Sequence, residues 1–317
     1  MTRFGYFLAS EEHRPNALVE QAVLAERAGF DALWISDHFH PWLEAQGESG
    51  FVWAVIGAVA QACDLPVTTA VTCPTVRIHP AVMAQAAATA QILTGGRFRF
   101  GVGSGEALNE HILGDHWPHA AVRLEMLEEA VEVIRKLFTG HQVSHRGRHY
   151  TVDTARLYSL PDTPPPIYVS GFGPKAIDLA ARIGDGFMTV QPNAEHVRRF
   201  RENGGGSKPV QGGVKACWGP DEAEARELAH RLWRTDALPG QAAQLLPLPA
   251  HFEEVTSLIE PEELPNPCGP DPEVHVKAIQ QYVDAGFDEV YISQIGPDQK
   301  GFFDFYEREV LPRVRAL

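Results

Sequence analysis

Short apolar runs alternate with longer amphipathic stretches along the whole chain. The apolar runs are rich in β-branched and aromatic residues, which is typical of strands. They cover residues 3–8, 31–36, 65–72, 97–103, 165–170, 186–190, 209–217 and 288–293. Because they lack strict alternation of polar and apolar positions, they indicate parallel strands that are buried on both faces.

A helical pattern follows each of these runs. The first places Leu18, Ala22 and Ala25 on one face, and Gly29 is its stop signal. The other helices are predicted at 51–62, 80–94, 120–138, from 173, and at 194–203, 220–234 and 302–310. Eight strand–helix units in series favour an α/β fold, a closed (β/α)8 TIM barrel.

Two stretches do not fit the repeat. Residues 140–160 predict a small β-ribbon, and residues 236–272 form an insertion rich in Pro, Leu and Glu. We therefore expect one barrel domain over residues 1–317 with these two insertions. The 44% of hydrophobic residues suffices for a single large core.

Composition limits the partners. A formal net charge of −14 argues against nucleic acid or an anionic membrane surface. The longest apolar run, residues 51–60, is well short of the ~20 residues of a membrane span. The beginning of the chain lacks the layout of a signal peptide. The four cysteines of the chain are scattered without a CxxC pair, which fits a reducing cytoplasm. Together these observations lead us to expect a cytoplasmic protein that acts on a small molecule.

Polar and aromatic residues gather at the carboxyl ends of the predicted strands, where barrels of this kind build their active sites. In "SDHFHPW" (36–42), His38 and His40 form an HxH pair like that of zinc-dependent hydrolases. Such a zinc site needs further ligands from other strand ends. Those ends carry Ser170, Thr189 and Gln191 instead. A metal-dependent hydrolase is therefore the less favoured interpretation.

Two glycine-rich ends follow strands. "GVGSGE" (101–106) has Glu106 where a dinucleotide fingerprint needs its third glycine, but its glycines allow a planar ligand to approach the backbone. "SGFGPKA" (170–176) begins a helix and is either a phosphate cradle or an ordinary tight turn. Taken singly, His38 could be structural, Glu106 a helix cap and Trp42 a core or lid aromatic.

Together these motifs resemble the luciferase-like flavin and deazaflavin barrel enzymes. "SDHFHPW", "TCPT", "GVGSGEALNE" and the final "QYVDAGFDEVYI" are similar to the coenzyme F420-dependent glucose-6-phosphate dehydrogenase group. The resemblance implies hydride transfer between a hydroxyl-bearing carbon and the deazaflavin F420. It also implies His38 as the base, Glu106 as the acid that protonates the reduced ring, and Trp42 as the aromatic that holds the substrate.

The same resemblance implies the cofactor contacts, a homodimer and a non-proline cis peptide between Ala70 and Val71. The expected cofactor-binding residues are Asp37, Val71, Cys73, Asn109, Gly171, Phe172, Gly173 and Thr189, with Phe172 in place of a usual glycine. No metal is expected.

The chain departs from this group where the group binds the phosphate of its sugar. Asn193 stands near the place of one lysine, and Glu253 and Glu254 stand near the place of another. A phosphate needs cationic or backbone donors. We therefore expect an uncharged substrate, namely a sugar, a secondary alcohol or the corresponding carbonyl compound. The alternatives are an FMN-dependent monooxygenase of the same superfamily and a cofactor-binding protein without turnover.

Overall fold

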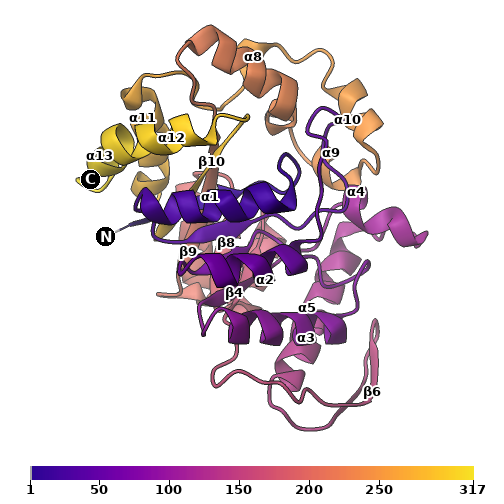
Figure 1. Cartoon of the computed structure of the whole chain (residues 1–317). Coiled ribbons are helices and arrows are strands. Elements are labelled where there is room, and N and C mark those ends of the chain that lie inside the picture. Colours follow the sequence, from indigo (N-terminus) through magenta and orange to yellow (C-terminus); the bar gives the residue numbers. More distant parts are fainter. Residues whose placement is uncertain (1) are drawn as a thin grey trace.

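A computed structural model describes residues 2–317 and contains a closed barrel of eight parallel strands (Figure 1). Around the barrel the order is β1, β10, β9, β8, β7, β4, β3, β2. The bounds are β1 Arg3–Leu8, β2 Leu33–Ile35, β3 Val67–Thr69, β4 Phe98–Val102, β7 Ile167–Ser170, β8 Gly186–Thr189, β9 Val210–Ala216 and β10 Glu289–Gln294. Each lies within one residue of a predicted run or inside it, and the TIM-barrel prediction is confirmed.

Helices surround the barrel. They are α1 Pro15–Arg27, α2 Val52–Ala62, α3 Pro80–Leu93, α5 Ala120–Leu137, α6 Pro174–Ile183, α7 Ala194–Phe200, α11 Pro272–Asp284 and α12 Gln299–Phe305. The last helix continues through Tyr306–Val310 into α13, Leu311–Val314. None of the helices between residues 2 and 317 is both long enough and apolar enough to span a membrane.

The seventh strand–helix unit differs from the prediction. Helix α8, Glu222–Trp233, does not cover the barrel; it lies away from it beside the insertion, in a separate apolar cluster with Cys217 and Leu264 (Figure 1). The helix that packs between β9 and β10 is α11, which buries His275, Ile279 and Tyr282. The prediction was wrong here because several helices lie between these strands, and the last of them, α11, is the one that faces the barrel.

The insertion before α11 contains two short helices, α9 Ala242–Leu245 and α10 Pro249–Val255. Phe252 of α10 packs with Leu43 and Leu108 in an apolar cluster that also contacts Trp42. Helix α8, which precedes the insertion, is held where Gln46 donates to the Leu232 carbonyl at 2.9 Å. The chain between β9 and β10 thus covers part of the barrel mouth.

The second insertion is an antiparallel ribbon of β5, Val143–Arg146, and β6, Thr151–Ala155. Glu129 of α5 holds it by accepting from the backbone amides of His149 and Tyr150, at 3.0 and 2.9 Å. The Tyr150 hydroxyl donates to the Thr75 carbonyl at 3.0 Å, so the ribbon also supports the loop after β3.

Inside the barrel, the amino ends of the strands carry a compact polar network. The buried Glu289 carboxylate accepts hydrogen bonds from four side chains: Arg3, Arg99, Gln211 and Tyr291. Trp34 donates to Gln211 at 2.9 Å and stacks on Tyr291 with 4.5 Å between ring centroids. This amino-end network leaves the opposite end of the barrel for the site.

Candidate active site

The predicted site residues lie at the carboxyl ends of five barrel strands, and contacts join these ends. His38 and Trp42 follow β2, with 4.9 Å between their ring centroids. Asn109 follows β4 and reaches back to the β2 loop, where its side-chain oxygen accepts from the amides of Phe39 and His40 at 2.9 and 3.2 Å. Parallel strands bring these loops to one rim, as the motif positions predicted.

The His38 ring has a defined orientation. Its Nδ1 lies 3.1 Å from the His40 carbonyl oxygen. Because a carbonyl oxygen only accepts, Nδ1 must carry the proton and Nε2 is the basic nitrogen. The side chain is only 10% exposed. This arrangement leaves one nitrogen of His38 able to take a proton from a ligand at the rim.

A carboxylate that the sequence analysis missed stands next to that nitrogen. Glu11, in the loop after β1, places its Oε1 3.4 Å from His38 Nε2. Its Oε2 accepts from the Ser36 hydroxyl at 2.5 Å, and the side chain is buried. A buried carboxylate at this distance stabilises the imidazolium once His38 has been protonated. The signal was present in "ASEEH" after the first strand, at the same rim as the other motifs.

Glu106 follows β4 at the N-cap position of α4, Ala107–Glu110. Its side chain caps nothing and makes no hydrogen bond within residues 2–317. It is partly exposed. The capping interpretation therefore lacks support, and the carboxyl group is available to a ligand.

The backbone at the end of β3 is special. The peptide bond between Ala70 and Val71 is cis, which confirms the expectation taken from the family. A Cβ at Gly103 would lie 2.6 Å from Val71 Cγ2, and a Cβ at Gly105 would lie 2.5 Å from the Cys73 sulfur. Glycines at these two positions therefore let the β4 loop pack directly on Val71 and Cys73.

Asp37 is engaged inside the protein. Its carboxylate accepts from the Thr72 hydroxyl at 2.7 Å and from the Arg77 guanidinium at 2.9 Å. Burial raises the pKa of the neighbouring Glu110 to about 7, although Arg77 opposes that shift. Asp37 and Glu110 thus form a buried group of charges around Arg77, which the sequence analysis also missed.

Several buried polar atoms at the rim have no partner. They are the Nδ2 of Asn109 and the hydroxyl of Thr189, whereas the Oε1 of Glu110 and the Nε of Arg77 make no hydrogen bond but lie 3.5 Å apart as an ion pair. A buried polar group without a partner is costly, and such groups are rare. The Asn109 amide and the Thr189 hydroxyl are therefore suited to a polar ring with donors and acceptors along its edge.

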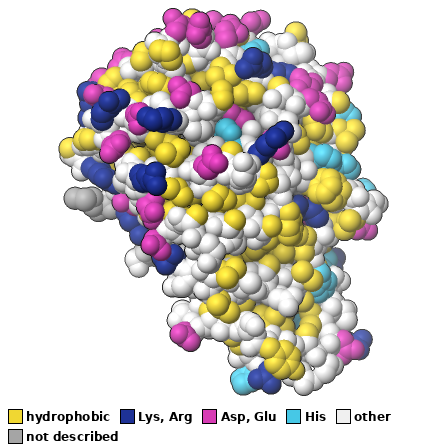
Figure 2. Space-filling view, in the orientation of Figure 1, with side chains coloured by type: hydrophobic (Ala, Val, Ile, Leu, Met, Phe, Trp, Pro, Cys, Tyr) yellow, Lys and Arg dark blue, Asp and Glu magenta, His cyan; other side chains and the backbone are white. Residues whose placement is uncertain are grey.

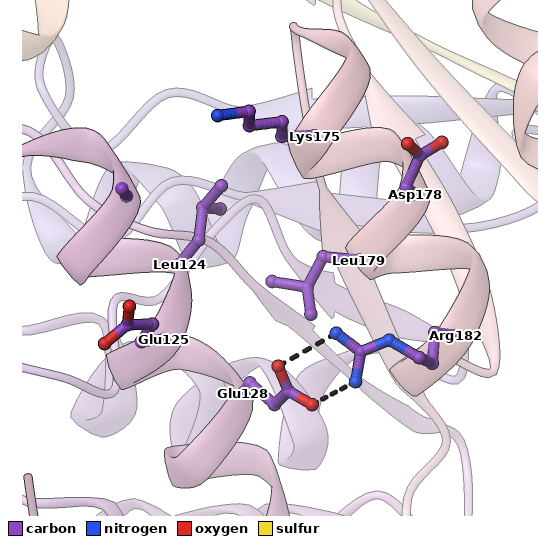
Figure 3. Close-up of a pocket in the computed structure, with 8 residues that line it drawn as sticks. Leu124, Glu125, Glu128, Lys175, Asp178, Leu179 and Arg182 are labelled. Carbon is purple, nitrogen blue, oxygen red and sulfur yellow. Dashed lines mark hydrogen bonds and ion pairs between the residues drawn. The ribbon is translucent and has the colours of Figure 1, made fainter. Parts of the chain in front are cut away.

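The glycine-rich turn before α6 divides into two parts. Gly171 is buried, and a Cβ there would lie 3.0 Å from Ala176, so this glycine serves packing. Gly173 is the N-cap residue and has nothing near its Cβ position, while Phe172 is 42% exposed. The open backbone at the positive end of this helix fits a phosphate group. Lys175, in the first turn, is exposed and lies beside the same turn (Figure 3).

The HxH pair does not converge. His40 Nδ1 lies 2.8 Å from the Leu108 carbonyl, and its ring stacks on His111, whereas His38 turns toward Glu11. Within residues 2–317, no group of three His, Cys, Asp or Glu side chains is arranged to hold a metal ion. The geometry therefore favours proton transfer by His38 over metal ligation.

The residues expected to disfavour a phosphate, Asn193, Glu253 and Glu254, differ in their contacts. Asn193 caps α7 by accepting from the Glu195 amide at 2.9 Å. Glu253 forms an ion pair with Arg234, and Glu254 is exposed. Lys215, near the end of β9, lies 2.8 Å from the Asp236 carboxylate. Two basic side chains near the mouth, Arg234 and Lys215, are thus already paired with carboxylates.

Comparison with known proteins places the chain. The model of the luciferase-like monooxygenase family matches residues 1–289. The chain belongs to the luciferase-like family. It is 34% identical over 331 residues to the F420-dependent glucose-6-phosphate dehydrogenase of Beutenbergia cavernae, covering 100% of this chain and 98% of the relative. It is 35% identical over 321 residues to the F420-dependent hydroxymycolic acid dehydrogenase of Mycobacterium tuberculosis, covering 98% and 88%.

A solved structure is similar over the same length. It is an F420-dependent secondary alcohol dehydrogenase in complex with an F420–acetone adduct, with a TM-score of 0.92, 33% identity and 99% of each chain covered. The resemblance inferred from the motifs is thus confirmed. The contacts of each site residue with a cofactor stay predictions.

Proposed function

We propose that this luciferase-like protein is an F420-dependent oxidoreductase that transfers hydride between the deazaflavin and the carbon of an uncharged alcohol or its carbonyl partner. The observation that carries the proposal is the His38–Glu11 pair beside Trp42. This pair places a base at the rim in a chain similar to several F420-dependent dehydrogenases. Bound F420 supplies the ring that accepts or returns the hydride.

The side chains of this protein supply proton transfer and position. His38 Nε2 takes the proton of the substrate hydroxyl, and Glu11 stabilises the resulting imidazolium. Nδ1 stays protonated because it donates to the His40 carbonyl. Glu106, whose carboxyl group has no internal partner, holds the proton exchanged with the cofactor ring.

The residues that would hold the cofactor are those with open polar groups or close backbone. The Asn109 amide and the Thr189 hydroxyl would bind polar groups of the ring, Val71 and Cys73 would support it, and the Gly173 turn would hold the phosphate. Asp37 is held by Thr72 and Arg77 and would act on the cofactor through them.

The uncharged substrate follows from the mouth of the barrel. Trp42 packs edge-to-face on Phe252, with 5.3 Å between centroids, and the surrounding cluster is apolar. Lys215 and Arg234 are neutralised by Asp236 and Glu253. A phosphate dianion would therefore find these two cations already paired.

The test is a titration with F420 and then with FMN, followed by substrate comparison. We expect F420 binding and reduction with 2-propanol or glucose, and weaker reduction with glucose-6-phosphate. A yellow protein that binds FMN and consumes oxygen would establish the monooxygenase alternative. A preference for glucose-6-phosphate above about tenfold, ~1.4 kcal/mol, would overturn the substrate assignment.

We also propose that the protein works in the cytoplasm as a homodimer joined through α2 and α3. A groove of about 340 Å³ between these helices is lined by Trp53, Val82 and Leu93, among others. Figure 2 shows apolar side chains gathered on this face, where Phe51, Val82 and Leu93 are 57%, 53% and 43% exposed. Light scattering should show a dimer that Val82→Glu converts to a monomer; an unmodified monomer would contradict the proposal.

A further inference from the structure

Arg77 lies in the loop after β3 and contacts the loops on both sides of it. Its side chain is only 7% exposed. Its Nη2 donates to Asp37 Oδ1 at 2.9 Å, and its Nε lies 3.5 Å from Glu110 Oε1. Its backbone amide donates to Glu110 Oε2 at 2.7 Å. One residue thus binds two buried carboxylates through three contacts.

The two carboxylates belong to the loops that carry the proposed base and acid. Asp37 directly precedes His38 in the β2 loop. Glu110 is one turn after Glu106, and its amide donates to the Glu106 carbonyl at 3.2 Å. Strand β3 separates β2 from β4 in the barrel, so these loops are not direct neighbours through their strands.

We propose that Arg77 is a positioning residue that sets the base His38 and the acid Glu106 at a fixed separation across the cofactor ring. The inference rests on the proposed function. Asn109 makes a second link between the same loops through its bonds to the amides of Phe39 and His40. Arg77 fixes the two loops that Asn109 connects, because it holds Asp37 in the β2 loop and Glu110 in the β4 loop.

The chemistry of the link requires a guanidinium. Arginine presents donors in a planar fork, so it can meet Asp37 and Glu110 at once, whereas a lysine ammonium is a single point of charge. Arg77→Lys keeps the charge among the buried carboxylates and the backbone contact to Glu110, but it loses the side-chain fork that meets both carboxylates. A shift of about 1 Å in a reacting group costs about 10²-fold in rate.

The test compares Arg77→Lys with Arg182→Lys. Arg182 of α6 pairs with Glu128 of α5 on the outer surface, in a two-pronged pair far from the rim (Figure 3). We expect Arg77→Lys to lower kcat at saturating F420 and substrate by about 10- to 100-fold. The Kd for F420, measured by fluorescence, should change less than about threefold, since the ring contacts stay in place. In Arg182→Lys, both kcat and the Kd for F420 should stay unchanged.

A second measurement uses the cofactor-free protein. Amide hydrogen exchange should rise at least about tenfold at residues 39 and 40 in Arg77→Lys, while strands β1 and β10 keep their protection. A merely structural role would instead lower protection throughout and leave kcat per folded molecule unchanged.

Three results would overturn the inference: kcat within about twofold of the unmodified protein, a loss of kcat that saturating F420 restores, or unchanged exchange at residues 39 and 40. Should Arg77→Lys fail to fold, Arg77→Gln combined with Glu110→Gln, which removes one charge of each sign, takes its place under the same criteria. Failure of the proposed function is distinguishable, because the unmodified protein would then not bind or reduce F420.

Discussion

The two ends of the barrel both bury charged side chains, but the groups at the centre of each end differ in how they are hydrogen-bonded inside the protein. At the amino end, the Glu289 carboxylate receives four hydrogen bonds within the protein. At the carboxyl end, the Asn109 amide and the Thr189 hydroxyl are buried without partners. The first network therefore stabilises the fold, whereas we propose that a ligand completes the second.

The largest effect expected at the carboxyl end is on rate. His38→Ala should lower turnover by ~10²–10⁴-fold, since it removes the general base. The melting temperature and the Kd for F420 should change little. His141→Ala, on the exposed turn before the ribbon, is the control and should keep full turnover. Full turnover in His38→Ala would remove this histidine from the mechanism.

The matching experiment at the amino end should affect stability alone. Glu289→Ala leaves Arg99 and Arg3 without their shared carboxylate, and breaking such a buried pair costs about 3–5 kcal/mol. Urea unfolding measures the loss. Turnover per folded molecule should be unchanged. Glu128→Ala, which removes a surface pair, should cost less than about 1 kcal/mol. A rate defect at Glu289 would weaken the contrast between the two ends.

The third prediction concerns pH. Burial raises the pKa of Glu110 to about 7, so the folded protein binds this proton more tightly than the unfolded chain does. Its contribution to the free energy of unfolding is therefore present at low pH and is lost as pH rises from about 4.5 to about 7, by roughly 3 kcal/mol. Unfolding of Glu110→Gln at several pH values should lack this component. An identical pH dependence in both proteins would contradict the assignment.

The smallest effect distinguishes a paired from an unpaired hydroxyl. Thr189→Val should weaken F420 binding by about 2- to 10-fold, the equivalent of one hydrogen bond, without lowering the melting temperature. Thr69→Val is the comparison. It removes a hydroxyl that donates to the Gly101 carbonyl at 2.8 Å, so the stability of this variant should fall. Equal losses of stability in the two variants would show that Thr189 has an internal partner after all.

The strands could be predicted because each one is a short apolar run between clear breaks. Most of the site motifs could be placed because parallel strands bring their carboxyl ends together. Arg77 could not be predicted as a site residue, because its role depends on partners in neighbouring loops. Glu11 was missed although it follows the first strand at the same rim. Helix α11 was missed because the stretch before it has no apolar period, so nothing indicated that the chain returns to the barrel.

The division of the site between the barrel and the insertion has a consequence for how such proteins diverge. The proposed redox machinery is carried by the loops of the barrel, whereas Phe252, which backs Trp42, is carried by α10. A change in α10 therefore alters what can reach Trp42 and leaves His38 and Glu11 in place. Substrate range can drift through one short helix while the redox partner is inherited unchanged.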